Sequence, residues 1–420
     1  MTQRDREPAE GCANPQAEQA RSHQIALPSA DAAVPSPRRE VRLRGPSELA
    51  DALPYLLGFH PDDSIVVVAL HGERGRFGGR LRIGIGGNPE EWQALSAQIA
   101  ACLASNARAR GRRPDGALVF LCKEPGTGET GHDVMERLRP LAQCLRVACG
   151  ERDMPVYEAL CLSAGRYWSY CCPDPVCCPS TGRPMAVPGT SVMAAAAAYA
   201  GLQVRGSLRE MQQRLEVIDS TFAEQQRRAL DSASATILPR MLSPDDSEVV
   251  RAETLRLAAK LMARFRKFPP SGDSSAGAAD AHDDGLLSHQ EAAMLIQGLQ
   301  DRGTRDRAAE WMEGADIAPA LRLWRAVARR CVAPFTEHAA APLTLAGWVA
   351  WSGGDEPSAR VALDKALRSD PKYVFAQLLH RACNDGLDPE PLRHCMRKQR
   401  DARDEASGQP DQRTDPRTAP

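Results

Sequence analysis

The sequence lacks a long apolar run. The alanine-rich run Met193–Ala200 is far shorter than the roughly 20 residues that a helix needs to cross a bilayer. The first eight residues also lack the apolar centre of a secretory signal. We therefore expect a soluble, cytoplasmic protein with no membrane partner.

An excess of charge is also missing. Lys and Arg together number 53, Asp and Glu 54, and the formal net charge is -1. Proteins that bind nucleic acid usually carry a strongly basic face. The two short basic stretches here, 38–44 and 108–113, lie beside a predicted disordered arm and at a predicted helix end, where cations offset the helix dipole. Nucleic-acid binding is therefore not expected.

Standard catalytic motifs are absent as well: the sequence has no Walker motif, nucleophile elbow or zincin motif. One Gly-x-Gly-x-x-Gly pattern, Gly126–Gly131, lies between a predicted strand and a predicted helix, as in dinucleotide-binding proteins. However, Lys123-Glu-Pro separates it from the strand, and the next strand ends at Leu162 without an acidic residue for a ribose. The pattern therefore does not favour nucleotide binding.

The 420 residues are enough for two or three domains, and the composition divides them. Polar stretches rich in Pro, Ser, Gly, Ala or charged residues predict disorder. The predicted parts are a disordered arm (1–40), an α/β domain with a cysteine-rich loop (41–203), a helical extension (204–268), a disordered linker (269–286), a helical, tetratricopeptide-like domain (287–397) and a disordered tail (398–420).

Alternating strand and helix patterns predict the α/β domain. The apolar run 64–70 indicates a buried strand, and 79–85, where apolar and polar residues alternate, indicates a half-buried one; a hairpin joins them most simply. This order predicts a mixed or mostly parallel sheet, and ligand sites usually assemble at the ends of such strands. The further predicted elements are helices over 92–102 and 132–148 and strands over 117–122 and 155–162.

From residue 192 onward every apolar pattern is helical. Within 343–387, the two tryptophans, the Gly353-Gly354-Asp355 turn and Asp370-Pro371 resemble a tetratricopeptide helix hairpin. One unit cannot form a solenoid, so the preceding helices are either degenerate repeats or a plain bundle. A groove between such helices would bind a protein or a peptide.

Four of the thirteen cysteines and three aromatic residues fall within residues 166–179, Arg-Tyr-Trp-Ser-Tyr-Cys-Cys-Pro-Asp-Pro-Val-Cys-Cys-Pro. We expect this run to form a loop that leaves the last strand of the sheet. Its Arg166 is a candidate anion ligand, because a guanidinium binds phosphate or carboxylate with two hydrogen bonds. Alternatively, Arg166 forms a salt bridge or stacks on Trp168.

A second polar group stands just before the first buried strand. The segment 58–64, Gly-Phe-His-Pro-Asp-Asp-Ser, holds His60, Asp62, Asp63 and Ser64, which suit acid/base or metal chemistry. The alternative is a turn whose Asp and Ser side chains cap backbone amides.

Two long motifs resemble a known family. Residues 43–68, with Leu-Arg-Gly-Pro-Ser-Glu-Leu and Leu-Pro-Tyr-Leu-Leu-Gly-Phe-His-Pro-Asp-Asp-Ser-Ile-Val-Val-Val, and residues 166–182 are similar to the actinobacterial family called domain of unknown function 4192. The resemblance covers roughly residues 41–395 and implies a tetratricopeptide-like end but no established activity. The family's loop pattern is matched at Arg166, Trp168, Ser169, Tyr170, Cys172, Asp174, Pro175, Cys177, Cys178, Pro179 and Gly182.

In this family Cys171 stands where an apolar residue is usual, so the resemblance implies that three thiols matter. Structural zinc requires four ligands and favours closely spaced pairs of cysteines, and no second pair or His-x3–5-His occurs in the sequence. A zinc ion here would need Cys171, His60 or Asp174 to complete its ligands. Zinc is therefore one hypothesis among three.

A disulfide between Cys172 and either Cys177 or Cys178 is the second hypothesis, because a short Pro-containing loop brings their Cβ atoms within reach. In a reducing compartment such a disulfide would be redox-sensitive. In the third, the thiols are small buried side chains under Trp168 and Tyr170.

Three functions follow. The first, which the missing catalytic set favours, is a non-enzymatic binding or regulatory protein with an α/β ligand or partner site and a helical interaction domain. The second is an enzyme or small-anion receptor with a strand-end pocket around Asp63, Arg166 and Trp168. The third is zinc binding or redox sensing through Cys172, Cys177 and Cys178. The candidate binding residues are Asp63, Ser64, Arg166, Trp168, Ser169, Tyr170 and Asp174.

Overall fold

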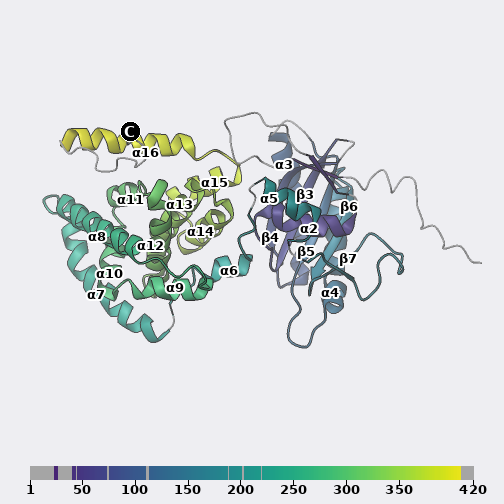
Figure 1. Cartoon of the computed structure of the whole chain (residues 1–420), viewed down its shortest axis with the longest axis horizontal. Coiled ribbons are helices and arrows are strands. Elements are labelled where there is room, and N and C mark those ends of the chain that lie inside the picture. Colours follow the sequence, from purple (N-terminus) through teal and green to yellow (C-terminus); the bar gives the residue numbers. More distant parts are fainter. Residues whose placement is uncertain are drawn as a thin grey trace, which may run out of the picture. The chain divides into compact units, whose positions relative to one another are not determined.

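The computed structural model describes residues 23–26, 40–43, 45–72, 75–109, 113–187, 189–200, 203–218 and 220–407. The chain divides into two compact units, 1–207 and 208–420, which are treated separately below (Figure 1).

The first unit contains a mixed sheet of eight strands. The strands are β1 (His23–Ala26), β2 (Glu40–Leu43), β3 (Ser64–His71), β4 (Arg76–Gly84), β5 (Gly116–Cys122), β6 (Val156–Ser163), β7 (Arg166–Ser169) and β8 (Arg183–Pro184). Their spatial order is β2-β1-β4-β3-β5-β6-β7-β8. The predicted hairpin is confirmed, since β3 and β4 pair antiparallel, and the sheet is partly parallel through β5 and β6.

The core of this unit lies on both faces of β3 and β5. Val67 and Val119 pack with Ile99 of α3 (Trp92–Ala109) and Leu138 of α4 (Gly131–Gly150). Neighbouring residues of these strands point to the opposite face, and Phe120 is equally buried there. The unit also contains α2 (Pro46–Leu57) and α5 (Val192–Tyr199). Strands buried on both faces explain the continuous apolar runs in the sequence.

Strand β1 lies inside the predicted disordered arm (1–40). It pairs antiparallel with β2 and meets β4 at Gln24 and Arg76, so disorder does not hold for residues 23–26. Backbone hydrogen bonds hold such an edge strand and need no apolar composition. The rest of the arm, up to residue 39, lies outside the described residues.

The second unit is helical, as predicted. Its helices are α6 (Leu208–Gln213), α7 (Ser220–Leu242), α8 (Ser247–Lys267), α9 (Ala276–Gly285), α10 (His289–Gly298), α11 (Arg302–Ala308), α12 (Ile317–Arg329), α13 (Ala340–Ser352), α14 (Glu356–Ser369), α15 (Val374–Asn384) and α16 (Glu390–Ser407). In the described part of the chain, none of the helices has both the length and the apolarity that crossing a membrane would take.

The predicted helix pair within 343–387 corresponds to α13 and α14, which the turn Gly353-Gly354-Asp355 joins. Gly347 of α13 lies close to α14, since a Cβ atom there would stand 2.7 Å from Cγ of Leu363. A glycine is therefore needed where the two helices pack. The tetratricopeptide character of this pair stays a prediction.

Helix α9 occupies most of the segment predicted to be a disordered linker (269–286). Its Asp280 and Asp283 are buried, and each binds an arginine. Asp280 accepts hydrogen bonds from Arg214 at 2.8–3.2 Å, and Asp283 accepts from Nε of Arg322 at 2.9 and 3.1 Å. The composition predicted disorder because these stabilising partners lie 66 and 39 residues away in the sequence.

Helix α16 extends the last predicted helix from residue 397 to Ser407, into the predicted tail (398–420). Glu313 accepts hydrogen bonds from Arg393 at 3.3 Å and Arg397 at 2.8 Å, and Glu310 pairs with Arg403. These ion pairs hold a helix whose sequence is too polar to predict a packed element. Residues 408–420 lie outside the described residues.

The contribution of α9 is testable at Asp283, which is 2 % exposed. Replacing it as Asp283→Asn leaves the Arg322 guanidinium without its carboxylate, and we expect a loss of about 3–5 kcal/mol in the free energy of unfolding. Urea denaturation of the full chain measures this loss.

The control is Asp364→Asn, which removes a carboxylate from the exposed pair with Arg368. Exposed pairs contribute about 0–1 kcal/mol. Equal effects of the two substitutions would contradict the role assigned to α9.

Candidate functional site

The cysteine-rich run begins as a strand rather than as a loop. Residues 166–169 form β7, which pairs antiparallel with β6. The turn between the two strands is Ala164-Gly165, and both residues have positive φ, 50° and 67°. Two-residue hairpin turns favour this backbone. Because Tyr167 and Trp168 are both buried, these residues extend the sheet, and the cysteines follow at its end.

Trp168 fixes the position of the loop. Its side chain is 5 % exposed, and its indole N–H donates a hydrogen bond to the Ser180 carbonyl at 2.9 Å. Two glycines lie against the ring: a Cβ atom on Gly131 would stand 2.6 Å from the nearest ring carbon, and one on Gly182 would stand 2.4 Å from the nearest. Gly131 begins α4, and Gly182 ends the loop. The indole therefore joins the loop to the first turn of α4.

The start of the loop is held by Ser169 and Tyr170. Ser169 donates a hydrogen bond to Glu158 at 2.7 Å and accepts from the backbone N–H groups of Cys171 and Cys172 at 3.1 and 3.0 Å. The Tyr170 hydroxyl donates to the Met135 carbonyl at 2.8 Å, and burial raises its pKa well above the ordinary value. Both side chains thus support the loop backbone.

Arg166 and Asp174, two candidate ligand-binding residues, also bind the loop backbone. Nη1 of Arg166 donates to the carbonyls of Thr181 and Gly182 at 3.2 and 2.8 Å. Oδ1 of Asp174 accepts from the Val176 amide at 2.8 Å, which closes a tight turn. Nη1 of Arg166 therefore serves the loop backbone.

Arg183 also holds the cysteine loop, although the sequence analysis did not identify this residue. Its guanidinium donates to the carbonyls of Cys177 and Val176 at 2.5 and 3.0 Å. No local pattern marks an arginine for this role, because the acceptors are backbone groups. Gly131 was missed for a similar reason, since its partner Trp168 lies in a distant part of the sequence.

The polar segment 58–64 forms a turn before β3. Oδ1 of Asp63 accepts a hydrogen bond from Nζ of Lys123 at 2.9 Å, and Asp63 has a positive φ of 41°. Ser64 is fully buried and donates to the Asp62 carbonyl at 2.6 Å. The backbone N–H of His60 donates to Gly206. The segment is a turn, but in these contacts Asp63 binds an ammonium group and Ser64 a carbonyl, not the backbone amides that the turn alternative predicted.

The 58–64 turn and the start of β7 stand at the same end of the sheet but on different strands. Ser64 pairs with Cys122, Cys122 with Leu162, and Leu162 with Tyr167. Three strand spacings separate the two ends, which amounts to about 14 Å. Asp63 and Arg166 therefore do not converge on one pocket.

The three predicted thiols do converge. The sulfur atoms of Cys172, Cys177 and Cys178 all lie within 4.8 Å of one another, and the three side chains are free thiols. Cys177 is exposed and the other two are partly buried, so these thiols are not core residues. Burial and the neighbouring thiols raise the pKa of Cys178 to about 12. Cys178 is therefore protonated at neutral pH in the absence of a cation.

Cys171 lies outside this cluster. It packs against the hydrophobic core, and burial together with Glu158 raises its pKa to about 11. Neither Cys171, His60 nor Asp174, the residues that the sequence offered as a fourth zinc ligand, is among the clustered ligands of the described residues. Three thiolates fit a soft metal ion with one position left for a water molecule or an outside ligand.

The Gly126–Gly131 pattern has a structural role. Thr130 caps α4 by accepting a hydrogen bond from the Asp133 amide, and the Asp133 carboxylate accepts from the Thr130 amide in return. This capping box places a negative charge where a nucleotide phosphate would bind. Gly131, the last glycine of the pattern, has no side chain and so leaves room for the indole of Trp168.

A protein-family model described as "Domain of unknown function (DUF4192)" matches residues 46–390. The match includes the 58–64 turn, the whole cysteine loop and most of the helical unit. Searches of curated proteins and of solved structures found no significant match.

The role of Trp168 is testable with two glycines that both have positive φ, Gly182 (71°) and Gly165 (67°). Gly165→Ala meets no atom within 4 Å, and we expect it to cost about 1–2 kcal/mol of stability from backbone strain alone. Gly182→Ala also collides with the indole, which adds about 1–3 kcal/mol.

Thermal unfolding and tryptophan fluorescence measure both effects. The emission should shift to the red in Gly182→Ala, because the indole loses its buried position, and should not shift in Gly165→Ala. Identical stability and emission in the two variants would refute the role of Trp168 as the contact that fixes the loop.

Proposed function

The chain belongs to the DUF4192 family, and we propose that it is a non-enzymatic binding protein whose cysteine loop holds a thiophilic metal ion. The ligands are Cys172, Cys177 and Cys178. The observation that carries the proposal is the convergence of their sulfur atoms within 4.8 Å.

The spacing of the thiols supports a metal ion of the size of zinc. With zinc–sulfur bonds of about 2.3 Å in tetrahedral geometry, neighbouring sulfur atoms stand about 3.8 Å apart. A contraction of at most about 1 Å converts the cluster into such a ligand set. Thiolates select zinc or cuprous copper over hard cations such as magnesium. Zinc is the simplest occupant, with a fourth ligand from solvent or from a partner.

The rigidity of the loop supports the same proposal. Ser169 orients the amides of Cys171 and Cys172, while Arg183 holds the carbonyls of Val176 and Cys177. A site whose ligand-bearing backbone is fixed loses little conformational entropy when the metal binds. The groups around the cysteines thus fix the backbone that carries the metal ligands, which raises the affinity for a metal. This role supports binding rather than catalysis.

A redox function uses the same residues. A disulfide from Cys172 to Cys177 or Cys178 would join two of the three thiols and leave the third without a role. The convergence of three sulfur atoms therefore favours a metal. Thiol titration separates the two functions, because oxidation removes two thiols from the count and metal binding is reversed by a chelator.

Binding of a protein or peptide by the C-terminal helices stays a prediction. The exposed apolar side chains Val374 and Leu378, one turn apart on α15, support it. Such a surface would connect the metal site to a partner in a regulatory protein.

The experiment titrates reduced full-length protein with Cd²⁺, which reports thiolate binding by ultraviolet charge-transfer absorption. We expect one ion per chain. Ser in place of Cys172, Cys177 or Cys178 removes one of three ligands, and each variant should lose at least tenfold in affinity, because even an outer-shell partner contributes that much.

The matched control is Cys171→Ser, which changes a thiol of the same loop outside the cluster and should bind Cd²⁺ like the original protein. Absence of the absorption band, or equal losses in Cys171→Ser and Cys178→Ser, would rule out the proposed site.

A further inference from the structure

Three arginines lie along one side of α12 in the helical unit, at positions 322, 325 and 329. The outer two bind carboxylates of α9. Arg322 pairs with Asp283, and Nη2 of Arg329 donates to Oδ1 of Asp284 at 2.8 Å. The middle arginine, Arg325, differs from them.

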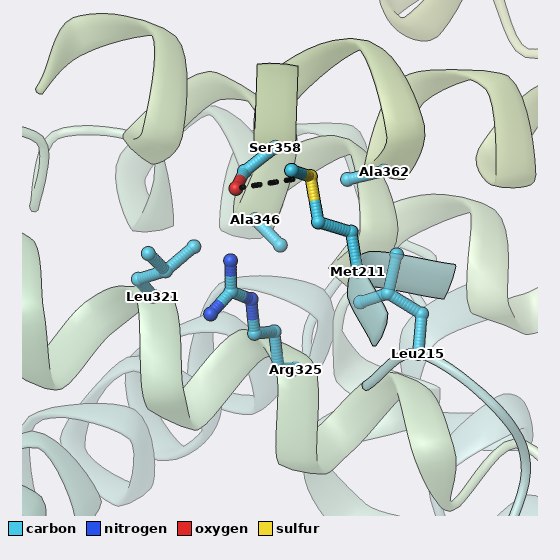
Figure 2. Close-up of a pocket in the computed structure, with 7 residues that line it drawn as sticks. All are labelled: Met211, Leu215, Leu321, Arg325, Ala346, Ser358 and Ala362. Carbon is cyan, nitrogen blue, oxygen red and sulfur yellow. Dashed lines mark hydrogen bonds between the residues drawn. The ribbon is translucent and has the colours of Figure 1, made fainter. Parts of the chain in front are cut away.

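Arg325 makes no hydrogen bond or ion pair with any described residue, although it is partly buried. Its side chain extends into a cavity, where the guanidinium lies beside apolar groups and one hydroxyl (Figure 2). The cavity is lined by Met211, Leu215, Leu321, Arg325, Ala346, Ser358 and Ala362.

The carboxylates nearest to Arg325 are already engaged. Asp280 binds Arg214 through both oxygens, and Asp355 accepts a hydrogen bond from the Ser358 amide at 3.2 Å, which caps α14. Both carboxylates favour the charged guanidinium, but burial and the positive charge of Arg214 outweigh them and lower the pKa of Arg325 to about 10. Arg325 therefore stays charged at neutral pH without a counterion in contact.

A partly buried charge without a partner is costly, because the apolar groups beside it cannot replace the hydration that it loses. The cavity has about 220 Å³ of space between atoms, but only a part the size of about one water molecule is wide enough to be filled. Ser358 also lines this space. The contact of its hydroxyl with the sulfur of Met211, at 4.0 Å, is a weak one.

We propose that this cavity binds a monatomic anion of the size of chloride, held by the guanidinium of Arg325 and the hydroxyl of Ser358. Chloride is close to water in size and accepts hydrogen bonds from several donors at once. It also carries the negative charge that would balance Arg325. Phosphate or a carboxylate group needs more room than the cavity offers.

The site would have a structural effect in the helical unit. Its lining residues come from α6, α12, α13 and α14 and from the segment after α6. An anion bound there connects these segments through one charge, and it stabilises only the folded state, because the unfolded chain does not assemble the cavity.

The experiment measures thermal unfolding of the full chain at constant ionic strength while sodium chloride replaces sodium gluconate, whose anion is too large for the cavity. We expect the midpoint to rise with the logarithm of the chloride concentration above the dissociation constant, and to have risen by about 3 °C or more at ten times that constant. Bromide should act in the same way, and crystals soaked in bromide should show an anomalous peak between Arg325 and Ser358.

Two variants test the residues. Arg325→Met should abolish the chloride response without lowering stability in gluconate, because it removes a charge that lacks a partner there. Ser358→Ala should keep the response with a weaker affinity. The control, Arg368→Met on the exposed face of α14, should respond like the original chain.

A chloride response that is unchanged in Arg325→Met, one that is linear in chloride concentration instead of logarithmic, or none at all in the original chain would overturn the proposal. A bromide peak at another position would also overturn it.

Discussion

The packing of one indole between two glycines determines where the thiols of this protein lie. Trp168 is buried at the end of β7, with Gly131 of α4 and Gly182 of the loop in contact with its ring. A side chain on either glycine would push the loop away from the sheet. Every hydrogen bond that shapes the loop, from Ser169 to Arg183, requires this position first. The convergence of the three sulfur atoms follows from an apolar contact in which no cysteine takes part.

The helical unit depends on a different kind of interaction, because charged groups form part of its interior. Helix α9 is too short and too polar to pack by hydrophobic contact, and aspartates on it bind arginines of α12. Buried pairs of this kind give specificity of position more than net stability. The same arrangement leaves one arginine of α12 facing an apolar cavity. Shape complementarity thus fixes the polar cysteine loop in the first unit, and charge pairing fixes the polar helix α9 in the second.

Sequence patterns predicted those parts of the fold that local periodicity determines. The apolar runs of β3 and β5 and the helical spacing of α3 and α4 identified the sheet and the helices beside it. The three clustered cysteines were also named, by their resemblance to the family. The patterns failed where the stabilising partner is distant. Composition predicted disorder for α9 because Arg322 lies 39 residues from Asp283, and nothing local indicated that Arg166 would bind carbonyls of its own loop.

Helix α16 bears on how fragments of this protein are designed. The family match ends at residue 390, where α16 begins, so a fragment cut at that boundary contains every element before the last helix. It also retains Glu310 and Glu313 while discarding Arg393, Arg397 and Arg403, their ion-pair partners. Two partly enclosed carboxylates would then face solvent without their cations. The boundary of the shared sequence is thus not the boundary of the folding unit, and a fragment that folds has to include α16 through Ser407.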